Sequence, residues 1–308
     1  MNSIDESYKN AMQKVLDEGE WVKTRTGIDC LTLFGGIQIE HDMGTSFPIV
    51  GLKETSFKLV MGELLWFLSG STDNDDLARF SEQDPSKTIW YENIKANGGP
   101  GNLYGHQWRR WNGKVDQISV IAETLITNPE SRQIMLTSYN PSEAPKAALP
   151  PCHVMAHFRV INGRLNCHVF QRSCDMFLGV PFNLASYGAL VHILCLAVGD
   201  EVDLKPGKLV WSGSDLHIYE THMRGVHEMM RRDPTMDKAR FEMMKTLPAF
   251  LEVDKEEFLM QLSSRSLGTK MVEDLEGIRN LEFDKYTASD FILQNYNPRK
   301  AIKAPMAV

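Results

Sequence analysis

Apolar residues follow a helical spacing in some parts of the chain and alternate with polar residues in others. Residues 8–16 place apolar side chains three and four positions apart before Gly19, which predicts an amphipathic helix that ends at a glycine. Residues 30–39 alternate well enough to predict a strand. Residues 56–68 are almost uniformly apolar and predict a buried helix, in which the single acid, Glu63, is conspicuous.

The middle of the chain combines strand-like runs with a second apolar helix. Three runs rich in β-branched and aromatic residues predict strands, and a long apolar run after Pro181 predicts a helix; the strands are 134–138, 154–160 and 164–170, and the helix is 185–197. Residues 70–105 are rich in Gly, Asn, Asp and Ser, and predict an irregular segment with a short helix near Asp75. Strands combined with buried helices indicate an α+β fold.

The domain organisation follows from the absence of a recognisable linker. We find no tract dense in Pro, Gly or Ser and no internal repeat, so one domain over residues 1–308 is expected. Residues 231–284 are charged and rich in methionine, with helix-like runs at 255–262 and 270–278. We interpret this stretch as a helical insertion at the periphery of the domain.

Composition narrows the class of protein. Hydrophobic residues make up 43% of the 308 and charged residues 24%, which is ordinary for a folded globular protein. The net charge of −7 argues against a general nucleic-acid surface, because such a surface needs an excess of Lys and Arg. The longest apolar stretches are too short for a bilayer, and five cysteines without framework spacing suit a reducing compartment. We therefore expect no membrane segment and a cytoplasmic location.

The sharpest chemical signal is Cys152, which follows two prolines and precedes His153 at the start of a predicted strand. A thiol fixed in this way suits attack on carbon, although free cysteines are commonly buried and inert. Arg172 follows the next strand, and could stabilise a thiolate or hold a phosphate with two hydrogen bonds, although a lone arginine is more often a solvated surface residue.

Eight blocks of sequence, in order along the chain, resemble the thymidylate synthase family, the folate-dependent enzymes with a cysteine nucleophile, which includes the related deoxynucleotide hydroxymethylases. The resemblance covers nearly the whole chain, and its fold implies a large mixed sheet at a homodimer interface. The blocks are residues 25–27, 63–68, 89–90, 104–109, 151–153, 171–186, 217–219 and 302–308.

The resemblance implies transfer of a one-carbon unit from 5,10-methylenetetrahydrofolate to C5 of dUMP, without a metal. Cys152 would add to C6 of the pyrimidine and make C5 a carbon nucleophile. Glu63 would organise water around the pyrimidine O4 and the C5 proton. The catalytic set that the family implies also includes Tyr104, Arg172, Asp175 and Asn183.

For the nucleotide, the resemblance assigns the uracil edge to Asn183, whose amide can donate to O4 and accept from the N3 hydrogen. The related deoxycytidylate hydroxymethylases have an aspartate at this position, so asparagine favours uracil. The remaining nucleotide positions are Arg25, Arg172 and Ser173 for the phosphate, His217 and Tyr219 for the sugar 3′-hydroxyl, Arg132 contributed by the partner of a homodimer, and Gln171 in the same substrate-binding set.

For the folate, the resemblance places Trp90 and Leu149 beside the pterin and Asp175 at the polar edge of its ring. Lys53 would meet the glutamate tail, and Ala307 with the final Val308 would close over the ring. Gly179 and Phe182 belong to the same cofactor-binding set.

Several positions depart from the usual family pattern near the site, so the product stays open. These departures are residues 51–54, Tyr91, Gln133, His157 and Ser214. Trp90 and the retained terminal block favour hydride transfer to give dTMP and dihydrofolate. Residues 51–54 and Tyr91 favour addition of water to give 5-hydroxymethyl-dUMP and tetrahydrofolate.

A hypothesis from a different functional class is that the chain is an RNA-binding regulator built on an inactive enzyme fold. The presence of Cys152, Glu63 and Asn183 weighs against it, because an inactive site should lose these residues first. Incidental RNA binding alongside catalysis stays open.

Overall fold

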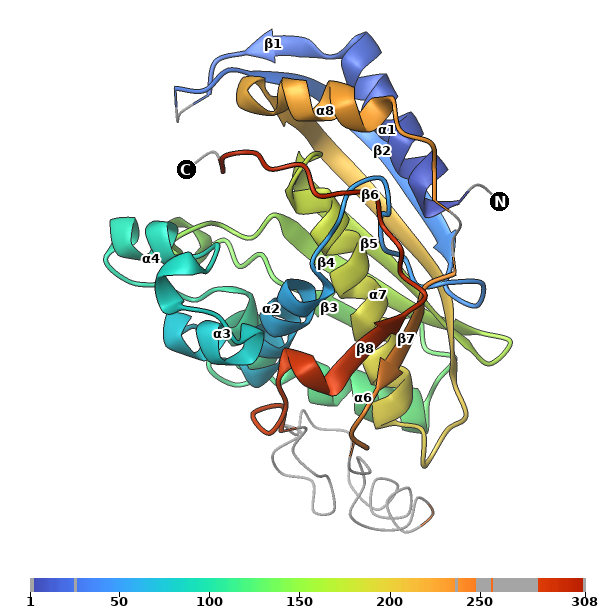
Figure 1. Cartoon of the computed structure of the whole chain (residues 1–308). Coiled ribbons are helices and arrows are strands. Elements are labelled where there is room, and N and C mark those ends of the chain that lie inside the picture. Colours follow the sequence, from blue (N-terminus) through green and yellow to red (C-terminus); the bar gives the residue numbers. More distant parts are fainter. Residues whose placement is uncertain (1–2, 25–26, 236–237, 248–255, 257–281, 307–308) are drawn as a thin grey trace.

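A computed structural model of the chain describes residues 3–24, 27–235, 238–247, 256 and 282–306. A twisted six-stranded sheet forms its centre (Figure 1), with the strand order β1-β2-β6-β5-β4-β3. The strands are β1 (Glu20–Val22), β2 (Cys30–Asp42), β3 (Met135–Thr137), β4 (His153–Ile161), β5 (Arg164–Asp175) and β6 (Lys205–Tyr219).

The sheet is mixed, because β5 and β6 run parallel while the other neighbouring pairs are antiparallel. The parallel pair brings Asp175 at the end of β5 opposite His217 near the end of β6. The expected α+β fold with a large mixed sheet is thus confirmed.

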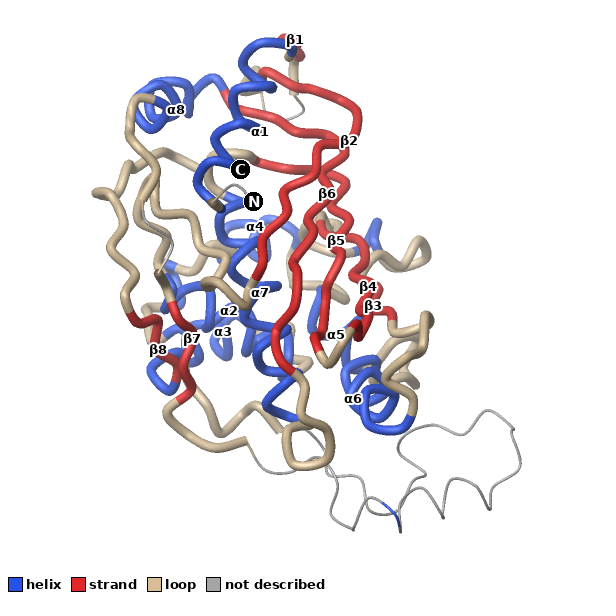
Figure 2. Tube along the Cα trace, turned by 90° about the vertical axis from the view of Figure 1, so that its right-hand side faces the viewer, coloured by secondary structure: helices blue, strands red, loops and turns tan. Residues whose placement is uncertain are grey.

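One face of the sheet is covered by α7 (Gly179–Ala197), as the view along the sheet edge in Figure 2 shows. Among the described helices, α7 alone is long and apolar enough to cross a membrane, but most of it is buried inside the fold. Its length and composition are therefore accounted for by its position under the sheet.

Helix α2 (Phe57–Ser69) packs against α7, α3 and α5 and carries Glu63 toward the interior. Ser56 caps its N-terminus by accepting from the Leu59 amide, and Gly70 ends it in the left-handed conformation. The other described helices are α1 (Ile4–Glu18), α3 (Asn74–Ser81), α4 (Tyr91–Asn97), α5 (Tyr104–Arg109), α6 (Gln117–Thr127) and α8 (Met223–Met230).

A small second sheet joins β7 (Arg240–Met243) to β8 (Phe291–Gln294) beside the lower end of α7 (Figure 1). Phe241 on β7 stacks on Phe47 with ring centroids 5.8 Å apart. Residues 240–243 and 291–294, distant in sequence, thereby pack on the core.

The other face of the large sheet exposes apolar side chains. On β5, Val169 and Gln171 are buried whereas Phe170 is 39% exposed, and Phe34 on β2 is 80% exposed. The homodimer interface expected from the sequence would lie on this face, and stays a prediction.

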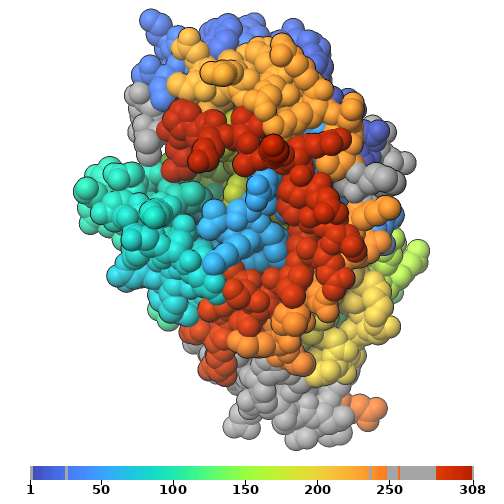
Figure 3. Space-filling model, in the orientation of Figure 1, coloured from blue at the N-terminus to red at the C-terminus, as the bar shows by residue number. Residues whose placement is uncertain are grey.

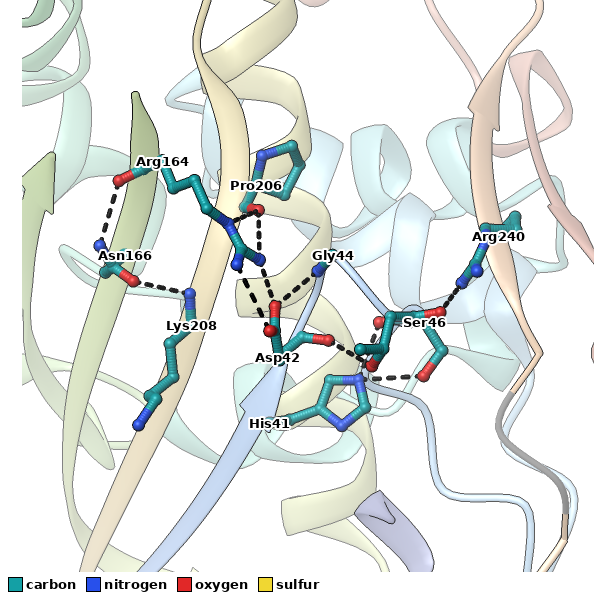
Figure 4. A network of polar contacts seen from close by, with 10 residues as sticks. His41, Asp42, Gly44, Ser46, Arg164, Asn166, Pro206, Lys208 and Arg240 are labelled. Carbon is teal, nitrogen blue, oxygen red and sulfur yellow. Dashed lines mark hydrogen bonds and ion pairs between the residues drawn. The ribbon is translucent and has the colours of Figure 1, made fainter. Parts of the chain in front are cut away.

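Polar contacts close the end of the sheet far from Cys152 (Figure 4). Arg164 forms an ion pair with Asp42 across strands β5 and β2, and also donates to the carbonyl of Pro206. Asn166 accepts a hydrogen bond from the backbone amide of Lys208 at 2.8 Å. These contacts fix the strand register and leave the opposite end of the sheet for chemistry.

The sequence expectations for helices and strands were incomplete. The short helix expected near Asp75 is present as α3, but residues 70–105 also contain α4 and the start of α5 and are not largely irregular. The strands β1, β6, β7 and β8 and the helices α6 and α8 were not predicted. The helix-like runs 255–262 and 270–278 lie, apart from residue 256, outside the described residues, and the single-domain organisation stays a prediction.

Candidate active site

Cys152 lies just before β4, where side chains from other elements hold the backbone on both sides of it. Arg172 donates from Nε to the Pro151 carbonyl at 2.8 Å and from Nη2 to the Pro150 carbonyl at 2.7 Å. The Arg172 backbone amide donates to the Cys152 carbonyl at 2.8 Å. The two prolines and this arginine together fix the position of the thiol, as the proline pair indicated.

The Cys152 amide is held by a buried tyrosine. It donates to the Tyr104 hydroxyl at 2.6 Å, and the Tyr104 ring stacks on His153 with centroids 4.0 Å apart. His153 in turn lies 2.9 Å from the Tyr187 hydroxyl, and burial lowers the pKa of His153 to about 3. His153 therefore stays neutral and supports the site as a packed ring.

The electrostatic surroundings act on the Cys152 thiol in opposite directions. Burial raises its pKa most strongly, while the Arg172 charge and a hydrogen bond from Ser173 lower it, and the net pKa lies above the ordinary value. Arg172 does therefore favour the thiolate, as expected.

Glu63 and Trp90 are joined directly by a hydrogen bond, in which Trp90 Nε1 donates to Glu63 Oε1 at 2.7 Å. Burial raises the pKa of Glu63 to about 7, and this hydrogen bond partly offsets the shift. Trp90 is 6% exposed and packs on Trp66 at 5.6 Å. A carboxyl group that can gain or lose a proton near neutral pH therefore lies beside an indole.

Asn183 on α7 has its amide oriented by a neighbouring glutamine. Gln171 Nε2 donates to Asn183 Oδ1 at 3.0 Å, and Gln171 Oε1 accepts from Trp211 Nε1 at 2.9 Å. Gly179 lies between Asn183 and Asp175, since a Cβ there would stand 3.8 Å from Asn183 Oδ1 and 3.5 Å from Asp175 Cβ. Flat rings could approach the backbone closely at this glycine.

Asp175 ends β5 and receives two backbone hydrogen bonds on one oxygen. The amides of Phe177 and Leu178 donate to Oδ1 at 3.0 and 3.1 Å. Burial raises the pKa of Asp175, but His222 and these amides outweigh it, and the net pKa lies below the ordinary value. Asp175 is therefore a fixed carboxylate at neutral pH.

His217 and Tyr219 lie at the C-terminal end of strand β6, with ring centroids 5.2 Å apart. The His217 carbonyl accepts from the Met176 amide at 3.0 Å, which ties this end of β6 to the residue after Asp175. Burial raises the pKa of Tyr219 to about 12, so its hydroxyl keeps its proton. The two side chains can both donate to and accept from a neighbouring hydroxyl group.

Lys53 is more enclosed than a residue that meets a flexible tail would be, since only 3% of it is exposed. Its ammonium lies 5.2 Å from the centroid of Phe177. Burial lowers its pKa to about 8, and the Asp175 charge opposes that shift. Contact of Lys53 with a glutamate tail stays a prediction, and its positive charge also acts on Asp175.

His222 is a buried member of this group that the sequence reasoning did not single out. Its Nε2 lies 2.8 Å from the carbonyl oxygen of Pro305, and its Nδ1 lies 3.7 Å from Asp175 Oδ1. In Figure 3 the C-terminal segment, coloured red, crosses the face of the molecule beside α8. Sequence alone gave no signal for His222, because a histidine three residues after Tyr219 has many ordinary roles.

Three of the predicted residues, Arg25, Ala307 and Val308, lie outside the described residues. Leu149 and Phe182 are partly buried and pack on the core. Arg132 is exposed on the segment before β3, with its carbonyl 3.2 Å from His157 Nε2. Contribution of Arg132 to a partner subunit stays a prediction.

The unusual residue Gly51 has a local explanation. A Cβ there would lie 2.1 Å from Thr235 Oγ1, so the threonine fills the space that a side chain at 51 would need. Buried Asp5 accepts from the Gly51 amide at 2.7 Å and from the Thr235 hydroxyl at 2.8 Å. The Gly51 carbonyl accepts from the Arg299 amide at 2.8 Å.

The next part of the same segment is held by residues that come much later in the chain. The Thr55 amide donates to the Tyr296 hydroxyl at 2.9 Å, and that hydroxyl donates to the Val50 carbonyl at 2.9 Å. The segment that carries Lys53 is therefore fixed by both ends of the chain.

The comparison with known families agrees with this arrangement. The family model described as thymidylate synthase matches residues 6–308, which include every described side chain of the candidate site.

Proposed function

The chain belongs to the thymidylate synthase family, whose members transfer a folate-borne one-carbon unit to dUMP, and from this premise we propose that it is a thymidylate synthase that yields dTMP and dihydrofolate. The chain is thus a one-carbon transferase of nucleotide biosynthesis, with 5,10-methylenetetrahydrofolate as co-substrate. The proposal concerns the last step, in which hydride rather than water adds to the exocyclic methylene group of the nucleotide.

The observation that carries this proposal is the enclosure of Trp90. It is almost fully buried, donates to Glu63 at 2.7 Å and packs between Trp66 and Tyr104. An indole held in this way lines the reacting centre with apolar surface and directs its one polar hydrogen away from water. Exclusion of water favours hydride transfer over hydration.

In this proposal Cys152 is the nucleophile that bonds to C6 of the pyrimidine. Arg172 favours its thiolate, while Tyr104 and the proline pair hold it still. Glu63, with a pKa of about 7, can pass a proton at O4 or C5 through water. Addition of the thiolate leaves negative charge on the pyrimidine, so a protonated Glu63 would suit this step.

Base selection would rest on Asn183. Gln171 uses its amide hydrogen on Asn183 Oδ1, which leaves Asn183 Nδ2 to donate to the pyrimidine O4. Uracil presents an acceptor at that position whereas cytosine presents a donor. His217 and Tyr219 would hydrogen-bond the sugar 3′-hydroxyl, and Ser173 with Arg25 and Arg172 would bind the phosphate.

The described residues fit a folate. Gly179 leaves room beside Asp175 and Asn183 for a flat ring, and the two backbone bonds of Asp175 end on Oδ1, so Oδ2 can accept from ring N–H groups. When bound, the folate supplies the one-carbon unit and the hydride. Leu149, Phe182 and Lys53 would surround it, and the segment ending in Ala307 would close over it.

The second candidate is a dUMP hydroxymethylase, which the altered segment 51–54 favours. Gly51 packs on Thr235 where the family usually has a larger side chain, and Tyr91 directly follows Trp90. Both positions depart from the usual family pattern, although Thr235 fills the space that a larger side chain at 51 would occupy. The two reactions share the steps up to formation of the exocyclic methylene group.

Product analysis separates the two. We would incubate the protein with dUMP and methylenetetrahydrofolate and identify the nucleotide and the folate by mass spectrometry. The proposal expects dTMP with dihydrofolate. Recovery of 5-hydroxymethyl-dUMP with tetrahydrofolate would replace it with the hydroxymethylase, and the Tyr91→Asp variant would then test whether Tyr91 is the cause.

The proposal includes a homodimer, in which Arg132 of one subunit binds the phosphate held by the other. Its support is the exposed apolar face of the large sheet and the exposed position of Arg132. Mixing an Arg132→Ala variant with an inactive Cys152→Ala variant should restore activity if the arginine crosses the interface. Absence of any recovered activity would contradict it.

A further inference from the structure

His222 has two partners that belong to different parts of the proposed folate site. It precedes α8, is fully buried, and is packed between Phe177 at 5.5 Å and Tyr219 at 5.4 Å. Because the ring is fully buried and both aromatic residues pack against it, the imidazole has little room to turn. Its two nitrogens therefore keep fixed directions.

One nitrogen of His222 is directed to the C-terminal segment. Nε2 lies 2.8 Å from the Pro305 carbonyl, which can only accept, so Nε2 carries a hydrogen. Among the described residues 301–306, the Pro305 carbonyl alone hydrogen-bonds to another described part of the chain. Ile302 and Ala304 add only partial burial against the core.

The other nitrogen is directed to Asp175. Nδ1 lies 3.7 Å from Asp175 Oδ1 and, among the described residues, has no partner at hydrogen-bonding distance. Burial lowers the pKa of His222, but Asp175 and the Pro305 carbonyl outweigh it and the net pKa is raised. Lys53 is the opposing charge nearby, and its effect is the smallest. The ring can thus carry hydrogens on both nitrogens.

We propose that His222 is a positioning residue that ties the C-terminal segment to Asp175, so that binding of the folate at Asp175 tightens the hold on Pro305. The inference rests on the proposed function, because it takes Asp175 to contact the folate ring. A ligand at Asp175 would fix the carboxylate, the carboxylate would fix the His222 ring, and the ring would fix the carbonyl of Pro305. In the proposed function the nucleotide contacts none of these three residues.

Two substitutions at 222 separate the parts of this linkage. In His222→Phe the ring volume stays but both polar contacts are lost. In His222→Gln the side-chain amide can still donate to Pro305, although it cannot offer a charge to Asp175. His192→Phe is the matched control, because His192 on α7 is a partly buried histidine that also packs against aromatic rings, those of Phe47 and Phe241.

The measurement is hydrogen–deuterium exchange of amides in residues 301–306, made with dUMP alone and with dUMP plus tetrahydrofolate. We expect tetrahydrofolate to slow this exchange about tenfold in the parent and in His192→Phe, and less than twofold in His222→Phe, with His222→Gln between them. The KM for methylenetetrahydrofolate should rise about tenfold in His222→Phe, while the Kd for dUMP stays within about twofold.

Parent-like protection and an unchanged folate KM in His222→Phe would overturn the proposal. If His222→Phe does not fold, His222→Gln decides, since a fully parent-like result in both readouts would equally overturn it. Failure of the proposed function looks different. The parent would then release no dTMP from dUMP and methylenetetrahydrofolate, although the exchange experiment could still be carried out with the two ligands.

Discussion

The nucleotide side of the site is held by more hydrogen bonds than the C-terminal segment on the folate side. Around Cys152, the backbone groups of residues 150–152 are bonded to Arg172 and Tyr104, and the amide of Asn183 is bonded to Gln171. On the folate side, residues 301–306 are held by partial burial and by one hydrogen bond to His222. A covalent bond needs a fixed nucleophile, whereas a segment that closes over a ligand must also open.

Among substitutions on the nucleotide side of the site, Cys152→Ala should have the largest effect on turnover. We expect turnover to fall by about 10⁴-fold or more, because no other described side chain occupies the position of the thiol. Binding of dUMP, measured by calorimetry, should remain detectable. Turnover within about tenfold of the parent would rule out the covalent route.

The oriented amide of Asn183 predicts the next largest effect. In Asn183→Asp we expect the ratio of kcat/KM for dUMP over dCMP to fall by about 10³-fold, since a carboxylate cannot donate to O4 and can accept from the cytosine amino group. Steady-state kinetics with both nucleotides measures this ratio. An unchanged base preference would show that Asn183 does not read the pyrimidine.

Because Glu63 is buried, the free energy of unfolding should depend on pH. Its pKa is about 7 in the folded chain and 4.5 ordinarily. Between these values the folded protein binds a proton that the unfolded chain has released, so the free energy of unfolding falls as pH rises, by about 3 kcal/mol at most. Above pH 7 the loss is complete.

Glu63→Gln should abolish that pH dependence while keeping the acceptor for Trp90. Urea unfolding of parent and variant from pH 4.5 to 7.5 gives the difference in free energy at each pH. We expect the parent to lose stability relative to the variant across this window. Parallel stability curves would mean that Glu63 is not protonated near neutrality.

The smallest effect is expected for Tyr104→Phe, which sharpens the comparison by loosening one support of Cys152. Loss of the hydroxyl leaves the Cys152 amide without its acceptor, at about 1 to 2 kcal/mol of stability. Thermal unfolding and the rate of thiol alkylation measure it. Tyr187→Phe is the control, since Tyr187 contacts His153 rather than Cys152; equal alkylation rates in the two variants would contradict the assignment.

The sequence predicted site residues and helices best where a short stretch of residues carries a distinctive pattern. The proline pair before Cys152 and the lone acid in an apolar helix, Glu63, both mark residues that the structure places on buried, well-supported positions. The apolar spacing of residues 8–16 and the apolar runs 56–68 and 185–197 predicted α1, α2 and α7, with α2 placed to within one residue and the starts of α1 and α7 placed too late. Local pattern suffices in these cases because one element alone determines the outcome.

The sequence was least informative where distant segments meet. Strand β6 contains Pro206 and Gly213, which weaken a strand pattern; yet a Cβ at 213 would lie 2.4 Å from the Trp211 ring, so the glycine is needed for packing. The burial of Lys53 and the two contacts of His222 depend on segments separated in sequence. The position of Arg132 relative to a second subunit depends on another chain altogether.

The tether between Val50, Thr55 and Tyr296 also sets an order of events during synthesis. Tyr296 is made 246 residues after Val50, which at typical ribosomal rates is roughly 12 to 50 seconds later. Until then the stretch that carries Lys53 lacks its outer support, even if the large sheet has already formed. The residues around Cys152 are therefore complete in a nascent chain well before the segment that carries Lys53 is fixed. Chains arrested before Tyr296 should bind the nucleotide more readily than the folate.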